Sequence, residues 1–379
     1  MVLTQEIQKN RAKLGMGVMR FPMSDIISRK IDRELGSKII HEAIKLGVNY
    51  FDTAYGYHRG DSEKFLGEVL KDYQRDKYFI ATKLPIWKIK SLDDAKSIFE
   101  EQQERLQTNY FDYYFLHNWQ GEERFSVVTK YKIIDFLHDM KEKGYIRNLG
   151  FSYHDVPEVL EKRLELYQWD IVQLQINYVD WELQRANESC EILKRKNIPV
   201  IAMEPVRGGM LAQLDEEAML ILSRGNTNLS PAALALRWVA TQTDCEVILS
   251  GMSTIEQLKE NASLFNNDYR LSENELYVIE KIKKTILKSQ KVLCTACRYC
   301  CSCPAKIDIP EYIKIYNRYL AGAGLADFGY EYEQLQTRVT STKACLLCNK
   351  CMERCPQKIE VPVIIKEINK TYQDFLNFH

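Results

Sequence analysis

Eight short apolar runs alternate with helical stretches over the first 270 residues, and this alternation limits the fold more than any other feature of the chain. Most of the runs are continuous apolar sequence, which is typical of parallel strands buried on both faces. The expected strands span residues 14–19, 48–53, 78–84, 113–118, 146–152, 170–177, 199–205 and 246–251. Eight such units predict a chain of the α/β class that closes into a (β/α)₈ barrel, a fold of about 250 residues.

The segments between the strands agree with this prediction. Residues 34–47 place apolar side chains at helical spacing. Segment 230–242 opens with Ser230 and Pro231, a favourable start for a helix. An open doubly wound sheet is the structural alternative. The count of eight strands favours closure, and no G-x-G-x-x-G sequence follows the first strand.

Polar and ionisable residues gather at the ends of the expected strands. In a barrel of this type the active site lies at the carboxyl ends of the strands. Each such residue taken alone is explained better by a structural role, because buried polar groups usually find partners. Their placement on successive strands instead predicts a common site. The residues concerned are Asp52, Lys83, His117, Ser152, Asn177, Glu204 and Ser250.

Three motifs resemble those of the aldo-keto reductase superfamily. They are YFDTAYGYHRGDSEKFLG (50–67), ATK (81–83) and YFLHNW (114–119). The resemblance extends over about residues 12–270 and includes LGMGVMRFP (14–22) and KEN (259–261). It implies an oxidoreductase that interconverts a carbonyl and an alcohol by hydride transfer with a nicotinamide nucleotide.

The resemblance also implies a catalytic tetrad of Asp52, Tyr57, Lys83 and His117. Tyr57 would be the general acid in reduction and the general base in the reverse direction. Lys83 would stabilise the Tyr57 phenolate, and Asp52 would hold Lys83 charged. His117 would orient the carbonyl oxygen. Tyr55 is expected to be core or pocket wall, because the family places the acid five residues after the aspartate.

The cofactor positions depart from the family pattern. Tyr153 stands where members carry an asparagine, and Met203 where they carry a stacking aromatic residue. Gly251 and Gln257 stand where many members place basic residues around the 2′-phosphate of NADPH. We therefore expect NADH to be favoured over NADPH, with a flavin as an alternative cofactor. The expected contacts are Ser152, Gln173, Met203, Val206, Gly208, Ser250, Gly251, Gln257, Glu260 and Asn261.

Nine of the eleven cysteines follow position 293, which favours metal ligands over a disulfide scaffold. The run Cys345-x₂-Cys348-x₂-Cys351-x₃-Cys355-Pro has the spacing of bacterial ferredoxins, in which the fourth cysteine binds the other cluster. An earlier run is spaced similarly. The rule predicts two [4Fe–4S] clusters. One is assigned Cys294, Cys297, Cys300 and Cys355, and the other Cys303, Cys345, Cys348 and Cys351.

An internal repeat supports pairing the two runs. CPAKIDIPEYIKIYN (303–317) aligns without a gap with CPQKIEVPVIIKEIN (355–369), and both halves are expected to form helices. Two Cys₄ zinc sites are the alternative, although zinc sites usually use paired C-x₂-C units. Cys301 is expected to be a bystander. Cys190 and Cys245 are expected to be buried small residues.

The chain is therefore expected to hold a barrel (1–270), a linking helix (271–290) and a mainly α-helical ferredoxin-type domain (291–379). A net charge of zero argues against nucleic acid as a partner. No apolar run is long enough to span a membrane and no signal peptide is recognised, so a cytoplasmic location is expected.

The leading hypothesis is an aldo-keto reductase in which two clusters relay electrons. Its expected partners are a small carbonyl or alcohol substrate and a redox partner protein. A second hypothesis is a redox-sensing or electron-transfer protein on the same barrel, with structural clusters.

Overall fold

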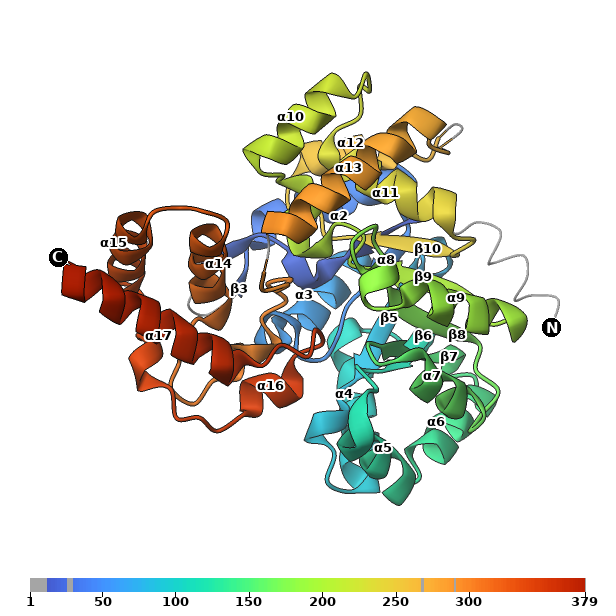
Figure 1. Ribbon diagram of the computed structural model, residues 1–379. Coiled ribbons are helices and arrows are strands. Elements are labelled where there is room, and N and C mark those ends of the chain that lie inside the picture. The colour runs from blue at the N-terminus through green and yellow to red at the C-terminus, as the bar shows by residue number, and fades with distance from the viewer. Residues whose placement is uncertain (1–11, 26–29, 267–268, 290, 379) are drawn as a thin grey trace. The chain divides into compact units, whose positions relative to one another are not determined.

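The structure is a computed structural model that describes residues 12–25, 30–266, 269–289 and 291–378 (Figure 1). Its backbone contacts divide the chain into two compact units. We call Met1–Val206 with Ala232–Ser272 the barrel unit, and Arg207–Pro231 with Glu273–His379 the C-terminal unit. Segment 207–231 falls in the sequence range expected for the barrel, yet it groups with the C-terminal unit.

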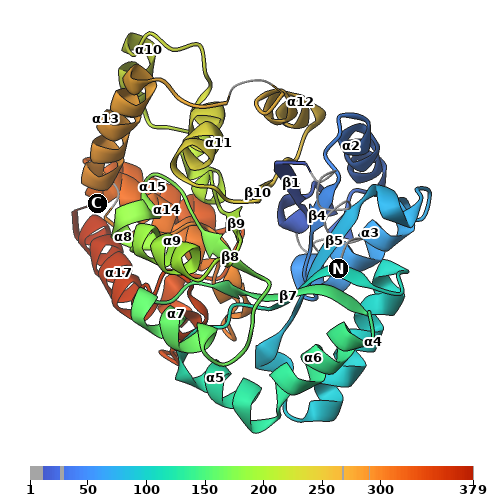
Figure 2. The same ribbon diagram turned by 90° about the vertical axis from the view of Figure 1, so that its right-hand side faces the viewer.

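Eight parallel strands form the closed barrel (Figure 2). They are β1 (Leu14–Gly17), β4 (Tyr50–Asp52), β5 (Phe79–Leu84), β6 (Phe111–Leu116), β7 (Ile146–Tyr153), β8 (Ile171–Gln175), β9 (Val200–Met203) and β10 (Val247–Ser250). The first strand pairs in parallel with β4, where Met16 faces Phe51, and with β10, where Leu14 faces Ile248. These two pairings close the sheet, so the predicted (β/α)₈ barrel is confirmed.

The inside of the barrel is filled by side chains from all around the sheet. Tyr50 and Tyr113 pack with their ring centroids 5.1 Å apart. The same buried layer includes Phe79, Ala81, Phe115, Ile171, Ile201, Val247 and Leu249. Where β7 passes β8, only glycine fits, because a Cβ on Gly150 would lie 2.2 Å from the Ile171 carbonyl oxygen. The packed layer closes the barrel below the carboxyl ends of the strands.

Amphipathic helices cover the outside of the strands, as the sequence predicts. The helices expected over 34–47 and 230–242 are present as α2 (Arg33–Lys45) and α11 (Pro231–Gln242). The other helices of this unit are α3 (Asp61–Leu70), α4 (Leu92–Leu106), α5 (Gly121–Lys130), α6 (Ile133–Glu142), α7 (Pro157–Leu164), α8 (Asp180–Leu183), α9 (Ala186–Arg195) and α12 (Ile255–Ser263). In Figure 2, α4, α5 and α6 form part of this outer ring.

A short antiparallel pair, β2 (Met23–Asp25) and β3 (Lys30–Ile31), precedes α2. This pair is not among the eight strands that the sequence predicts. The Asp61 side chain holds the return strand, since Oδ2 accepts from the Ile31 amide at 3.1 Å and Oδ1 from Arg33 at 2.7 Å. The pairing is thus fixed by a residue some 30 positions away, which local sequence does not reveal.

The described part of the C-terminal unit contains helices but no named strand. The helix expected over 271–290 is α13 (Glu273–Ser289), and α10 (Glu216–Arg224) packs along it. A Cβ on Gly225 would lie 2.5 Å from Val278, and Asn274 Nδ2 donates to the Gly225 carbonyl at 2.6 Å. These contacts explain why segment 207–231 groups with this unit. The remaining helices are α14 (Ile309–Leu320), α15 (Leu325–Gln336), α16 (Lys350–Arg354) and α17 (Val361–Phe378).

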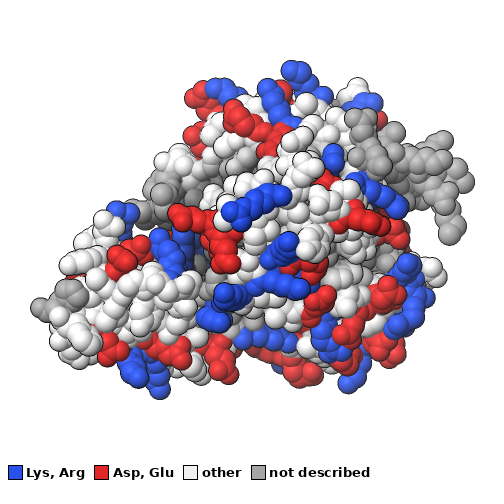
Figure 3. Space-filling model, turned by 45° about the horizontal axis from the view of Figure 1, so that its top comes forward, with Lys and Arg blue, Asp and Glu red and all other residues white. Residues whose placement is uncertain are grey.

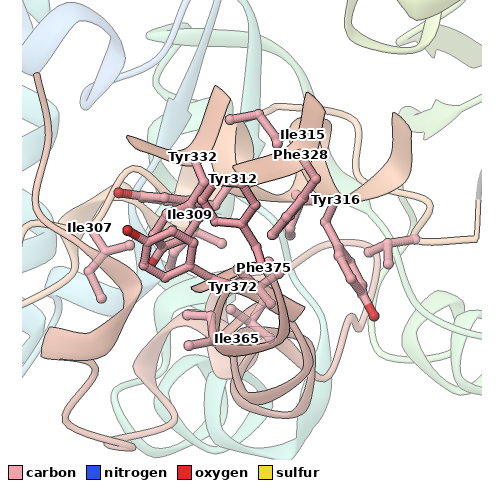
Figure 4. Close-up of a cluster of buried hydrophobic side chains, with 14 residues drawn as sticks. Ile307, Ile309, Tyr312, Ile315, Tyr316, Phe328, Tyr332, Ile365, Tyr372 and Phe375 are labelled. Atoms are coloured by element: carbon pink, nitrogen blue, oxygen red, sulfur yellow. The ribbon is translucent and has the colours of Figure 1, made fainter. Parts of the chain in front are cut away.

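An aromatic cluster holds α14, α15 and α17 together (Figure 4). Tyr332 stacks on Tyr372 with centroids 4.0 Å apart, and Tyr312 lies 5.1 Å from Tyr332. Gly329 lets α15 approach α17, because a Cβ there would lie 2.2 Å from the Phe375 ring. This core gives the C-terminal unit its own hydrophobic centre, as an independent domain requires.

Charges of both signs are interspersed on the face shown in Figure 3, in keeping with the zero net charge. None of the helices in the described part of the chain is both long and apolar enough to cross a membrane.

Candidate active site and candidate cluster sites

Asp52 and Lys83 form a buried ion pair inside the barrel. Asp52 ends β4 and Lys83 lies on the neighbouring β5. The Lys83 ammonium donates to Asp52 Oδ1 at 2.5 Å and to the Thr53 carbonyl at 2.7 Å. Its side chain is only 2% exposed. Burial lowers the pKa of Lys83, whereas the Asp52 carboxylate acts to raise it. Lys83 is therefore a buried cation that is shielded from solvent and paired with the Asp52 carboxylate.

Tyr57 and His117 face this pair. Tyr57 opens the short 3₁₀ helix η2 (Tyr57–Gly60), and His117 follows the end of β6. Lys83 Nζ lies 5.1 Å from the centroid of the Tyr57 ring. The Tyr57 and His117 rings meet edge to face, with centroids 5.9 Å apart. The four residues of the predicted tetrad therefore lie at one place, at the carboxyl ends of β4, β5 and β6.

Burial, together with the nearby Lys83 and Arg124 charges, lowers the pKa of His117 well below its ordinary range. The imidazole is therefore neutral at pH 7. Trp87 packs on it with ring centroids 4.9 Å apart. A neutral imidazole can donate a hydrogen bond to a carbonyl oxygen without adding charge to the site.

The loop that carries Tyr57 has an unusual backbone. His58 and Arg59 both adopt the left-handed conformation, with φ of 50° and 57°. Such residues are strained by about 1 kcal/mol or more each, and they persist where surrounding contacts fix them. The Tyr57 amide donates to the Ala54 carbonyl at 3.1 Å. This turn directs the Tyr57 ring back towards Lys83.

Tyr55 has another environment. Its hydroxyl donates to Glu101 at 2.7 Å, and the Arg105 guanidinium lies 4.2 Å from its ring centroid. The two tyrosines of the motif thus differ in their surroundings, because Tyr55 contacts α4 whereas Tyr57 lies beside Lys83 and His117.

A buried polar network behind Lys83 was missed by sequence analysis. The Glu63 carboxylate is fully buried and accepts from Thr82 Oγ1 at 2.6 Å and Gln102 Nε2 at 2.5 Å. It also accepts from Arg105 Nη1 at 3.1 Å. Burial raises the pKa of Glu63, and these donors oppose the rise. The quoted motif GDSEKFLG contains Glu63, but its partners lie on β5 and α4.

Gln173 and Asn261 carry acceptors that are unsatisfied in the part of the chain the structure describes. Gln173 Nε2 donates to Asp52 Oδ2 at 2.9 Å, which leaves its buried Oε1 without a hydrogen bond. Asn261 Nδ2 donates to Ser250 Oγ at 3.1 Å, and its buried Oδ1 likewise lacks a partner. A buried acceptor without a donor is costly. Both atoms are therefore fitted to receive a donor from a bound molecule.

The other expected cofactor contacts have varied environments. Ser152 is buried on β7, and its Oγ accepts from the Asn118 amide at 2.7 Å. Gln257 is used locally, since its Oε1 accepts from the Ser253 amide at 2.8 Å before α12. Glu260 is exposed on α12, and Met203 is half-buried at the end of β9. Val206 ends the first segment of the barrel unit, whereas Gly208, with φ of 70°, belongs to the C-terminal unit.

Arg20 is a further basic residue beside the expected cofactor positions. A Cβ on Gly251 would lie 3.1 Å from the Arg20 side chain. The Arg20 guanidinium lies 3.7 Å from Glu204. Sequence analysis did not name Arg20, because it follows the first strand while Gly251 follows the last.

Eight of the nine cysteines of the C-terminal unit line two separate cavities. One is lined by Cys294, Cys297, Cys300 and Cys355, and the other by Cys303, Cys345, Cys348 and Cys351. These are the two sets that the ferredoxin spacing predicts. Among the described residues, no three or more His, Cys, Asp or Glu side chains form a ready metal site as placed. The thiols therefore face common cavities without closing into a ligand shell.

The remaining three cysteines do not line these cavities. Cys301 lines neither cavity, and its Sγ lies 3.9 Å from Arg298 Nη1. Burial raises the pKa of Cys190 to about 12, which makes it an inert thiol. Cys245 is buried.

The internal repeat is visible in two equivalent asparagines. Asn317 on α14 clamps Val292, with Nδ2 donating to its carbonyl at 2.7 Å and Oδ1 accepting from its amide at 2.9 Å. Asn369 on α17 contacts Thr342, whose hydroxyl donates to Asn369 Oδ1 at 2.5 Å. Val292 and Thr342 precede the first cysteine of their respective runs. Each half therefore anchors the start of a cysteine run on a helix that follows it.

A closed parallel barrel with ionisable residues gathered at the carboxyl ends of its strands is the architecture of a (β/α)₈-barrel enzyme. A sequence model of the Aldo/keto reductase family matches residues 13–284, so the chain belongs to the aldo/keto reductase family. It is an oxidoreductase of that family. The matched residues end before the cysteine runs.

Similar proteins cover between two thirds and three quarters of the chain. The oxidoreductase YqkF of Bacillus subtilis is 27% identical over 74% of this chain and 95% of its own length. The NADH-specific methylglyoxal reductase of Escherichia coli is 26% identical over 67% of this chain and 90% of its own. Among solved structures, aldo-keto reductase AKR11C1 from Bacillus halodurans is 25% identical, with a TM-score of 0.59 over 71% of this chain and 91% of that chain.

Proposed function

We propose that the protein interconverts a small carbonyl compound and the corresponding alcohol, with Tyr57 as acid and base. The observation that carries the proposal is the buried Lys83–Asp52 pair facing Tyr57 and His117 at the carboxyl ends of the strands. A nicotinamide nucleotide, when bound, supplies or accepts the hydride at the substrate carbon.

In the reducing direction, Tyr57 gives its hydroxyl proton to the carbonyl oxygen as that oxygen gains charge. The Lys83 ammonium stabilises the phenolate that Tyr57 leaves behind, and Asp52 keeps the ammonium oriented. The neutral His117 imidazole donates to the same oxygen and fixes the position of the carbonyl. In the reverse direction, the Tyr57 phenolate takes the proton from the alcohol.

We propose NADH as the preferred nucleotide. Gln173 Oε1 is suited to accept from the amide of a nicotinamide, because it is buried and unsatisfied. At the 2′-phosphate end, Gln257 is neutral and occupied with the Ser253 amide, while Arg20 lies near Glu204. A 2′-phosphate would thus gain little charge compensation there. The E. coli relative is named as NADH-specific. A flavin is the alternative cofactor, and the absorbance spectrum of flavin released from the purified protein would identify it.

We further propose that the C-terminal unit binds two [4Fe–4S] clusters. Two cavities, each lined by four cysteines drawn from both runs, support this assignment. Eight thiolates would hold the clusters, and cluster binding would draw the thiols together. We propose an electron relay through them, to or from a redox partner in the cytoplasm, because two clusters exceed what folding a small domain requires. A flavin, bound by this chain or by the partner, would convert the two electrons of a hydride into the single electrons that each cluster carries.

A second candidate function is redox sensing with structural clusters. Both candidate functions require iron in the protein. Only in the electron relay do electrons pass between the clusters and the substrate or the nucleotide. Anaerobically purified protein should contain iron and sulfide, whereas stoichiometric zinc would contradict the cluster assignment. Loss of cluster absorbance on adding NADH would support the relay. An unchanged spectrum during turnover would favour structural clusters.

The acid–base assignment is tested by Tyr57→Phe, with Tyr55→Phe as the matched control. The probe is methylglyoxal with NADH, chosen from the relative's printed activity. Tyr57→Phe should lower turnover at least about a hundredfold. Tyr55→Phe should retain most of it, because the substitution keeps the ring and the carbonyl that contact Arg105. Turnover that survives Tyr57→Phe unchanged would refute the role of Tyr57.

A further inference from the structure

Arg105, near the end of α4, contacts the loop that carries Tyr57 at two points. Its Nη1 donates to the Tyr55 carbonyl at 3.2 Å, and its guanidinium lies on the Tyr55 ring. On the other side of Tyr57, a Cβ on Gly60 would lie 3.4 Å from Arg105 Nη1. The guanidinium therefore lies against residues on both sides of Tyr57 in the sequence.

Two carboxylates hold the guanidinium in this position. Nη1 donates to the buried Glu63 at 3.1 Å, and Nη2 donates to Glu101 at 2.6 Å. Glu101 also accepts from the Tyr55 hydroxyl at 2.7 Å, which closes a ring of contacts around Arg105. The planar fork of arginine can satisfy these directions together, and lysine cannot.

The loop needs such a support because of its backbone. His58 and Arg59 are both left-handed, and Gly60 has φ of 92°. Consecutive residues of this kind keep their conformation only where neighbouring contacts over-determine it. The Arg105 side chain is 12% exposed and does not touch Tyr57 in the contacts described above. Its effect on Tyr57 passes through Tyr55 and Gly60.

We infer that Arg105 is a positioning residue for the reaction, which fixes the Tyr55–Gly60 loop and thereby holds the Tyr57 hydroxyl beside Lys83. This inference rests on the proposed role of Tyr57. It adds a residue from the helix after β5, outside the three motifs that carry the resemblance to the family.

Arg75 offers a matched control. It is also a partly buried arginine that binds a buried carboxylate, with Nη2 donating to Asp112 at 2.6 Å. It donates to the Tyr78 and Tyr110 carbonyls and lies on the Tyr110 ring. Arg75 thus has the same kinds of contact as Arg105, but it contacts no residue of the Tyr57 loop in the described contacts.

The experiment compares Arg105→Gln with Arg75→Gln by steady-state kinetics with methylglyoxal and NADH, and by amide hydrogen exchange. Arg105→Gln should lower kcat at least tenfold and leave KM for NADH within twofold. Exchange of the amides in 53–62 should rise at least tenfold in Arg105→Gln and stay unchanged in Arg75→Gln. The purely structural alternative predicts equal effects of both substitutions on kcat.

Should Arg105→Gln fail to fold, Glu101→Gln takes its place, because the Glu101 side chain is 43% exposed. It should show the same pattern with a smaller amplitude. Unchanged exchange in 53–62, or a kcat that Arg105→Gln and Glu101→Gln leave intact, would overturn the inference. If the unmutated protein does not reduce methylglyoxal, that result concerns the proposed function, and hydrogen exchange still decides the role of Arg105.

Discussion

Gln173 and Lys83 share the carboxylate of Asp52. Gln173 Nε2 lies 2.9 Å from one oxygen and Lys83 Nζ lies 2.5 Å from the other. The carboxylate thereby joins β5, which carries the cation, to β8, which carries the acceptor proposed for the nicotinamide amide.

Asp52→Asn should therefore destabilise the fold as well as impair catalysis. It leaves the Lys83 ammonium buried without its counter-charge, and breaking a buried pair costs about 3–5 kcal/mol. Urea unfolding at pH 7 measures this loss. The control is Glu34→Gln, which breaks an exposed pair with Lys38 at 2.6 Å, and there the loss should stay below about 1 kcal/mol. Equal losses in both variants would contradict the burial argument.

The stability of the fold should depend on pH through His117. Its pKa is well below the ordinary value in the folded chain, but about 6.5 in the unfolded chain. Above pH 6.5 neither state binds the proton, so this contribution is fully present. As the pH falls below 6.5, the unfolded chain binds the proton first, and stability is lost at up to about 1.4 kcal/mol per pH unit.

The variant His117→Asn lacks this proton-linked loss. Between pH 6.5 and pH 5, the free energy of unfolding of the unmutated protein should fall more steeply than that of the variant, by up to about 1.4 kcal/mol per pH unit. Urea titrations at the two pH values measure the difference. Parallel changes in the two proteins would mean that His117 is not buried in the neutral form.

The anchoring asparagines should act on separate cysteine runs. Asn317→Ala leaves the Val292 amide and carbonyl without that partner, at a cost of about 1–3 kcal/mol. It should weaken retention of the cluster at the first run, and Asn369→Ala that of the cluster at the second run. The measurement is the rate at which each variant loses iron to a chelator. Electron paramagnetic resonance of the reduced protein identifies which cluster is lost. Identical effects on both clusters would contradict separate anchoring.

Removing a thiol should separate ligands from bystanders. Cys303→Ser removes one of four thiols from its cavity and should cost at least half of the bound iron. Cys301→Ser should retain all of it, since Cys301 lines neither cavity. Iron and sulfide analysis of anaerobically purified variants is the measurement. Equal iron contents in the two variants would show that Cys303 is not a cluster ligand.

Local pattern was enough to predict the strands and the grouping of eight cysteines around two cavities, whereas the clusters themselves stay a prediction. A strand buried on both faces is a continuous apolar run in the sequence. In the ferredoxin spacing, the position of each cysteine in its run indicates which of the two cavities it joins. The support of the Tyr57 loop was not predictable in this way. Glu63 and Arg105 are 42 positions apart. A glutamate and an arginine so far apart form no sequence pattern that would predict their contact. The same holds for Arg20, which approaches Gly251 only because the first and last strands are neighbours in the closed barrel.

The crossed lining of the two cavities bears on how the protein matures. Cys303 joins the cavity of the later run, and Cys355 joins that of the earlier one. During synthesis, the first half of the unit leaves the ribosome with three thiols in its own cavity and no fourth. Neither cavity has its four thiols until the second run has been made, since the cavity of the earlier run needs Cys355 and the other needs the remaining cysteines of that run. A chain cut short before the second run would hold a complete set of four thiols in neither cavity, so it could form neither of the two proposed clusters.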